Sequence, residues 1–167
     1  DRRNQTFERM RILIVDDHST NRRVLEHYLI GADVTCQSVE NGELALHCLR
    51  QAVARRKPFD LAILDLHMPG MNGLELAQRI KSDQAIRATR LVLLTSGGQR
   101  GDAQAAQEAG LDAYLTRPIR RLLLFECLGA VLGHMPGTGG SADCAAASII
   151  TQHTVVESMM KARPLIL

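Results

Sequence analysis

Short apolar runs alternate with amphipathic segments along most of this 167-residue chain. Each of five runs has the length of a strand, and each is followed by a segment whose apolar residues recur at helical spacing. The predicted strands are 11–15, 34–39, 61–64, 91–94 and 113–115, and the predicted helices are about 20–30, 41–56, 74–81, 102–109 and 119–132. Such short connections require parallel strands with right-handed crossovers, and helices on both faces of one open sheet.

Polar residues that follow the predicted strands are the candidate functional residues. They are Asp16 and Asp17 after the first strand, Asp65 after the third, Thr95 and Ser96 after the fourth, and Thr116, Arg117 and Pro118 after the fifth. In a parallel sheet these positions converge on one edge. Three neighbouring carboxylates need a cation to stay ionised together, and oxygen-only ligands favour Mg²⁺. An acidic pair at a strand end can also cap a helix, but its convergence with Asp65, a hydroxyl and a cationic side chain favours a metal site.

Four motifs carry a resemblance to a known family. VDD at 15–17, LDLHMPGMNG at 64–73, LLTS at 93–96 and AYLTRP at 113–118 resemble the receiver domain of bacterial two-component response regulators. The resemblance covers 11–133, and we assign the receiver domain to 10–133. It implies a flavodoxin-like, doubly wound sheet with strand order 2-1-3-4-5.

The resemblance also implies roles for the acidic residues. Asp65 would be the phosphoacceptor and would take the phosphoryl group from a phosphohistidine of a histidine kinase or a histidine phosphotransfer domain. Asp16, Asp17, Asp65 and the backbone carbonyl of His67 would hold Mg²⁺. The fragment would then act as a signalling module and not as an enzyme, since the acceptor does not turn over quickly.

Further roles fall on the ends of the last two strands. Thr95 would hydrogen-bond the phosphoryl group, Tyr114 would be the switch aromatic, and Pro118 is a candidate cis-proline. The cationic residue departs from the family, which has Lys-Pro where this chain has Arg117-Pro118. Arginine keeps the charge but is bulkier and planar. We expect Asp65 to be phosphorylated and its coupling to the switch to be weakened.

Two alternatives stay open. In the first, the chain is a degenerate receiver that binds proteins independently of phosphorylation, and Arg117 marks the lost switch. In the second, it is an aspartate-nucleophile phosphatase of the haloacid dehalogenase type. That chemistry needs an acid two residues after the nucleophile, where this chain has His67. His18 and His67 could also admit a transition metal, although histidines beside loops are more often solvated.

Outside the receiver domain we predict an N-terminal extension over 1–9, a linker over 134–162 and, at 163–167, a candidate first strand of a second receiver domain. The sequence RPLIL at 163–167 echoes RILIV at 11–15. Together with STNRRVLEHYL at 19–29, this echo resembles hybrid sensor histidine kinases. We therefore expect contacts with neighbouring domains of a longer chain.

Charge and composition limit the partners. The net charge of +2 is made of interspersed signs, which argues against binding to nucleic acid or a membrane surface. No apolar stretch is long enough to span a bilayer, and the four cysteines form no C-x-x-C pair, so we expect a cytoplasmic domain with reduced thiols. The last predicted helix is apolar nearly all round. This pattern favours an interface with a neighbouring domain or a homodimer over simple tolerance of surface apolar residues.

Overall fold

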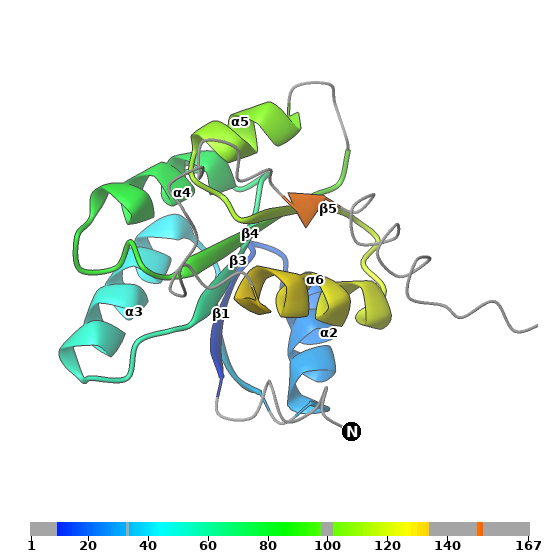
Figure 1. Cartoon of the computed structure of the whole chain (residues 1–167), viewed down its shortest axis with the longest axis horizontal. Coiled ribbons are helices and arrows are strands. Elements are labelled where there is room, and N and C mark those ends of the chain that lie inside the picture. Colours follow the sequence, from blue (N-terminus) through cyan, green and yellow to red (C-terminus); the bar gives the residue numbers. More distant parts are fainter. Residues whose placement is uncertain (1–9, 33, 98–101, 134–149, 152–167) are drawn as a thin grey trace, which may run out of the picture.

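A parallel sheet lies at the centre of the molecule, with helices on both of its faces (Figure 1). The computed structural model describes residues 10–32, 34–97, 102–133 and 150–151. The strands are β1 (Arg11–Val15), β2 (Thr35–Val39), β3 (Leu61–Asp65), β4 (Arg90–Thr95), β5 (Ala113–Thr116) and β6 (Ile150–Thr151). Their spatial order is β2-β1-β3-β4-β5-β6, and every neighbouring pair is parallel. The predicted order of the first five strands is confirmed.

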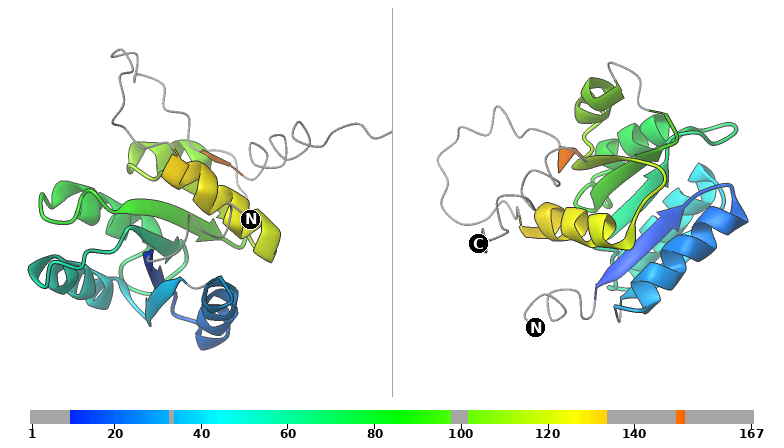
Figure 2. Two further views of the ribbon diagram at one scale, coloured as in Figure 1. Left: turned by 60° about the horizontal axis from the view of Figure 1, so that its bottom comes forward. Right: turned by 90° about the vertical axis from the view of Figure 1, so that its right-hand side faces the viewer.

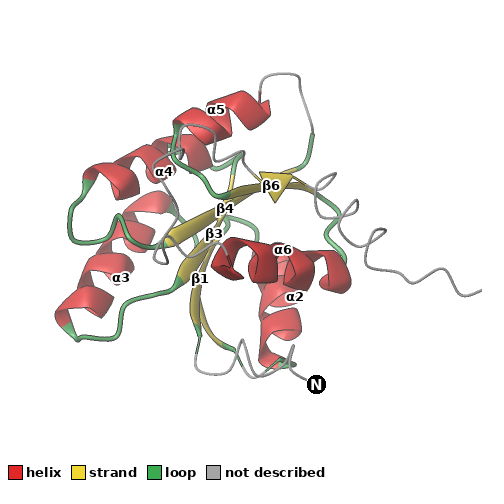
Figure 3. Cartoon of the chain, in the orientation of Figure 1, coloured by secondary structure: helices red, strands yellow, loops and turns green. Residues whose placement is uncertain are grey.

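Helices lie between these strands along the described part of the chain (Figure 3). They are α2 (Ser19–Ile30), α3 (Gly42–Ala54), α4 (Gly73–Ser82), α5 (Asp102–Glu108) and α6 (Arg121–Gly133). The predicted bounds differ by one or two residues, since sequence patterns locate helix ends poorly. Asn41 and Asn72 stand just before α3 and α4, and each side chain accepts a backbone N–H from the first turn. These caps fix where both helices begin.

The helices form two layers. Figures 1 and 2 show α3, α4 and α5 on one face of the sheet and α2 and α6 on the other. Each face has its own buried cluster because side chains alternate along each strand. Leu13 and Val15 of β1 belong to the cluster under α3 and α4, whereas Ile12 and Ile14 belong to the one under α2 and α6. Strands buried on both faces explain the continuous apolar runs in the sequence.

Strand β6 adds an edge that the sequence did not predict. Ala113 of β5 is opposite Ile150, and Tyr114 is opposite Thr151. These two residues of β6 lie inside 134–162, which the sequence predicts to be a linker. A two-residue strand has no periodicity that could reveal it. The predicted extension over 1–9, the rest of the linker and the candidate strand over 163–167 lie outside the described residues.

Most of the apolar side chains of α6 are buried inside the molecule. Its buried residues Leu123, Leu124, Cys127, Leu128 and Val131 pack against the sheet. Burial raises the pKa of the Cys127 thiol to about 12, so this thiol stays protonated and unreactive. Leu122 is 59% exposed. Within the part of the chain that is described, no helix combines the length and the apolar character needed to cross a bilayer.

Candidate functional site

The predicted carboxylates meet at the carboxyl ends of β1 and β3. These strands are neighbours, and Val15 is in register with Leu64, so the residues that follow them come side by side. Side-chain ligand atoms of Asp16, Asp17, His18 and Asp65 all lie within 4.8 Å of one another. Asp16 is 1% exposed and Asp65 is 4% exposed. The topology thus produces a dense, largely buried acidic cluster, as the sequence predicts.

Both carboxylate oxygens of Asp16 have partners. The backbone N–H of His18 donates to Oδ1 over 2.8 Å, and Asn21 Nδ2 lies 3.5 Å from the same oxygen. Oδ2 accepts a close hydrogen bond from Arg117 Nη2, which makes an ion pair between residues 101 positions apart. Arg22 Nη1 donates to the backbone carbonyl of Asp16 over 2.7 Å. Asp16 is therefore the most firmly held member of the cluster.

Asp65 is less well compensated. Burial first, and then the neighbouring charge of Asp16, raise the pKa of its carboxyl to about 6. The Arg117 guanidinium and a hydrogen bond from the backbone N–H of His67 act in the opposite direction on this pKa. The closest guanidinium nitrogen, Nη2, is 3.8 Å from Asp65 Oδ1. At neutral pH the Asp65 carboxylate is thus mostly ionised and nucleophilic, yet it lies in a negative, water-poor environment.

The predicted residues at the ends of β4 and β5 include Arg117, which contacts this cluster, and Thr95. Thr95 is fully buried, and its Oγ1 donates to the carbonyl of Gly97 over 3.1 Å and accepts the Gly97 N–H. The backbone N–H of Arg117 donates to the Thr95 carbonyl over 2.7 Å. The peptide bond between Arg117 and Pro118 is cis.

Tyr114 and His67 are placed differently. Tyr114 is 8% exposed and packs in the cluster beneath α3, α4 and α5. The His67 side chain is exposed, and its backbone N–H contacts Asp65. The other histidine, His18, has an exposed ring whose Nδ1 lies 2.9 Å from Asp17 Oδ1. Of the two histidines considered for a metal, only His18 has its ring within the cluster.

Close packing brings α4 up to the end of β3. A Cβ on Gly73 would lie 2.5 Å from the carbonyl oxygen of Asp65 and 2.7 Å from Leu93 Cδ1. The Gly73 N–H donates to the Leu66 carbonyl over 3.1 Å. Only glycine allows this approach without a shift of the backbone at Asp65. The sequence pattern gave Gly73 no role beyond loop chemistry.

Sequence reasoning also missed Asn21 and Arg22. Both lie in the first turn of α2, directly after the acidic pair. One helical turn returns their side chains toward the strand end that precedes the helix. The signal that could have found them is this spacing in STNRR, read together with the expectation that Asp16 needs partners.

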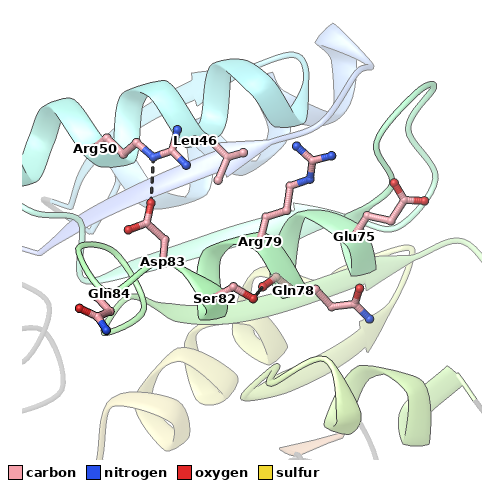
Figure 4. A pocket seen from close by; sticks show the side chains of 8 residues that line it. All are labelled: Leu46, Arg50, Glu75, Gln78, Arg79, Ser82, Asp83 and Gln84. Carbon is pink, nitrogen blue, oxygen red and sulfur yellow. Dashed lines mark hydrogen bonds and ion pairs between the residues drawn. The ribbon is translucent and has the colours of Figure 1, made fainter.

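A polar pocket lies away from this acidic cluster. It has a volume of about 880 Å³ and opens between α3 and α4 (Figure 4). Arg50 Nε contacts Asp83 Oδ2 over 2.9 Å, and Ser82 donates to the Gln78 carbonyl over 2.7 Å. Four of its lining residues are thus engaged in contacts with one another. Carboxylate convergence, and not cavity size, marks the functional site.

The acidic cluster fits a hard divalent cation by its donors. Three carboxylates at mutual ligand distance provide oxygen ligands, and the pKa of Asp65 is raised by burial first and then by the neighbouring negative charge of Asp16. His18 adds one imidazole at the exposed side. The residues present therefore suit Mg²⁺ better than they suit a softer metal, which would prefer nitrogen ligands.

Comparison with known proteins agrees with this geometry. The model of the response regulator receiver domain matches residues 12–128. Chemotaxis protein CheY-3 from Vibrio cholerae is 32% identical over 124 residues, which cover 73% of this chain and 91% of that protein. The sensory/regulatory protein RpfC from Xanthomonas campestris is 34% identical over 121 residues, which are 71% of this chain and only 16% of RpfC.

A solved structure shows the same fold. That of chemotaxis protein CheY4 from Vibrio cholerae superposes with a TM-score of 0.66 at 25% sequence identity, covering 73% of this chain and 98% of that one. The family match spans well over half of the chain and includes every element from β1 to the middle of α6. This chain belongs to the response regulator receiver domain family.

Proposed function

We propose that this domain accepts a phosphoryl group on Asp65 from a phosphohistidine in a Mg²⁺-dependent reaction. The observation that carries the proposal is the position of Asp65, a buried carboxylate within ligand distance of Asp16 and Asp17 and 3.8 Å from the Arg117 guanidinium. In the reaction, an Asp65 oxygen forms a bond to phosphorus while the bond from phosphorus to the imidazole nitrogen breaks. The imidazole leaves with the electron pair and takes up a proton.

The chain supplies the surroundings for this step. Asp16, Asp17, Asp65 and the carbonyl of His67 would hold Mg²⁺, which would neutralise charge on the incoming phosphoryl oxygens. The His67 N–H lowers the pKa of Asp65 and keeps its carboxylate oriented. Thr95 is bonded to Gly97, so its hydroxyl must leave this loop contact to reach a phosphoryl group. We propose Thr95, Tyr114 and Arg117 as the residues that respond to phosphorylation.

A donor protein would dock beside the site. A groove of about 470 Å³ lies next to Arg117, between α2 and the start of the β5–α6 connection. It is mostly apolar and is lined by residues such as Val24, Tyr28, Pro118 and Ile119. Val24 is 45% exposed. We propose that a histidine kinase or histidine phosphotransfer domain uses this surface, because Arg117, which lines it, lies 3.8 Å from Asp65.

We also propose that the parent chain is a hybrid histidine kinase, on the support of the partial match to RpfC. The parent chain could then carry an enzymatic activity that this domain lacks.

The exposed Leu122 on α6 supports a contact with a neighbouring domain or a second copy. Sedimentation with and without a phosphodonor tests the homodimer, since a monomer at high concentration in both conditions would exclude it.

The alternative of a binding module independent of phosphorylation has one observation in its favour. Arg117 already neutralises Asp16, so the cluster does not depend fully on a metal for its counter-charge. Titration with Mg²⁺ and exposure to a phosphodonor separate the two functions. A domain that does not bind Mg²⁺ and is not phosphorylated would act only as a protein-binding module.

The test is intact-mass spectrometry after incubation with a small phosphodonor. We expect a mass increase of one phosphoryl group with Mg²⁺, and none with a chelator or in Asp65→Asn. Asp60→Asn, at the opposite end of β3, is the matched control and should be labelled like the wild type. Equal labelling of Asp65→Asn and the wild type would overturn the proposal.

A further inference from the structure

We propose that Arg117 is a built-in competitor of the divalent cation, so that the metal binds only when the ion pair between Arg117 and Asp16 opens. The inference rests on the proposed metal site and concerns how that site is controlled. It starts from the two oxygens of Asp16. One is held by the His18 N–H and the other by the Arg117 guanidinium. A metal at the second oxygen would therefore lie directly beside the positively charged Arg117 guanidinium.

The position of Arg117 resembles that of a bridging cation. Its Nη2 contacts Asp16 Oδ2 and lies 3.8 Å from Asp65 Oδ1, so one nitrogen faces carboxylates from two neighbouring strands. The side chain is 19% exposed, and Asp16 is almost fully buried. Two cations cannot share so small a space without strong repulsion. A guanidinium also cannot leave by losing its proton, because it stays charged at any ordinary pH.

The structure provides a place for the displaced side chain. Arg117 itself lines the groove of about 470 Å³ that also contains Asn21, Val24 and Tyr28. The backbone of Arg117 is anchored by its N–H bond to the Thr95 carbonyl. Release of the guanidinium is therefore a side-chain movement from the acidic cluster into the groove. Metal binding and the shape of the proposed donor-docking surface become coupled through one residue.

Competition predicts tighter metal binding when the guanidinium is removed. In Arg117→Gln, which keeps much of the side-chain length without the charge, we expect Mg²⁺ affinity by titration calorimetry to rise by about tenfold or more. Arg22→Gln is the matched control, because Arg22 also approaches Asp16 but contacts its backbone carbonyl and not its carboxylate. We expect this control to change the affinity by less than about twofold.

A second measurement uses the wild-type protein and does not depend on the folding of a variant. In a nitrogen-15 NMR titration with Mg²⁺, the side-chain Nε–H signal of Arg117 should shift in step with site occupancy, and that of Arg22 should shift much less. Asp16→Asn should remove this response. An Arg117 signal unchanged at full occupancy would overturn the inference.

The outcomes separate this inference from the proposed function. If wild type, Arg117→Gln and Arg22→Gln bind Mg²⁺ equally, Arg117 is not a competitor and the proposed metal site stands. If both variants gain equally, the effect is general electrostatics and the inference is wrong. If no Mg²⁺ binds to wild type or to Arg117→Gln, both proposals fail.

Discussion

At the amino ends of the strands carboxylates meet hydrogen-bond donors, whereas at the carboxyl ends they meet one another. Before β3, Asp60 accepts the Arg11 N–H over 2.9 Å. Before β5, Asp112 accepts the Leu91 N–H over 2.9 Å and forms an ion pair with Arg90. Each of these two carboxylates therefore accepts a hydrogen bond from a backbone N–H of a neighbouring strand.

The carboxyl ends have the opposite balance. Asp16, Asp17 and Asp65 lie within 4.8 Å of one another, and Arg117 is the guanidinium that reaches two of the three carboxylates. The pKa of Asp65 is raised as a result of burial and of this crowding. The same residue type thus meets hydrogen-bond donors at one end of the sheet and like charges at the other, where we propose a metal site. The fold leaves the negative charge at the carboxyl ends of the strands only partly compensated.

The largest expected effect breaks the comparison at Asp65. A shift in the pKa of Asp65 from 3.8 to about 6 corresponds to a destabilisation of roughly 3 kcal/mol when the group is ionised. The folded state binds this proton more tightly than the unfolded state, so the contribution of Asp65 to stability falls as pH rises from about 4 to 6. We predict that Asp65→Asn is more stable than wild type at pH 7 by up to that amount in metal-free buffer.

Urea unfolding at several pH values checks this prediction. The difference between Asp65→Asn and wild type should shrink as the pH is lowered to 4, where the wild-type carboxyl is protonated in the folded state. Asp60→Asn, from the amino end of the same strand, should not be stabilised at any pH. A variant at residue 65 less stable than wild type at pH 7 would contradict the account.

The next largest effect is expected from the close packing of α4 against the carboxyl end of β3. Gly73→Ala places a methyl group against the Asp65 carbonyl and Leu93, and we predict a loss of about 2 kcal/mol in unfolding free energy. Gly42→Ala is the matched control, because Gly42 is also the first residue of a helix capped by Asn. The three atoms nearest to its added Cβ all belong to the side chain of Met71, and the closest is the sulfur at 2.7 Å.

For Gly42→Ala we expect a change within about 1 kcal/mol, since the methionine can move and alanine favours the helix. Thermal or urea unfolding of both variants measures the contrast. Equal losses would mean that α4 does not need close contact with the end of β3.

The smallest effect is expected at the amino end. Asp112→Asn keeps an oxygen for the Leu91 N–H but loses the charge that faces Arg90, a pair of which both side chains are about a quarter exposed. We predict a loss of about 1 kcal/mol at pH 7 by urea unfolding. Stabilisation by this substitution, as expected at Asp65, would remove the distinction between the two ends.

Much of the fold could be predicted because its elements carry strong local signals. The runs over 61–64 and 91–94 are apolar throughout, as strands buried on both faces must be, and alternation with helices fixes a parallel sheet. Parallel topology then brings Asp16 and Asp65 together from positions far apart in sequence. Strand β6 could not be predicted, because its two residues gain their structure only from pairing with β5.

Details of the site depend on tertiary geometry. The sequence identifies Arg117 as a cation at the strand edge, but only the structure shows that its guanidinium contacts Asp16 more closely than Asp65. The close approach of Gly73 to Asp65 likewise depends on how α4 packs, which no local pattern reveals. The roles of Thr95, Tyr114 and the His67 carbonyl stay predictions for experiment.

The most direct test locates the phosphoryl group in the wild-type protein. After reaction with a small phosphodonor and Mg²⁺, borohydride reduces an acyl phosphate selectively, and peptide mass spectrometry identifies the modified residue. The account predicts reduction at Asp65 and at no other carboxylate of the cluster. Reduction at Asp16 or Asp17, or unmodified Asp65 in protein that carries the label, would contradict it.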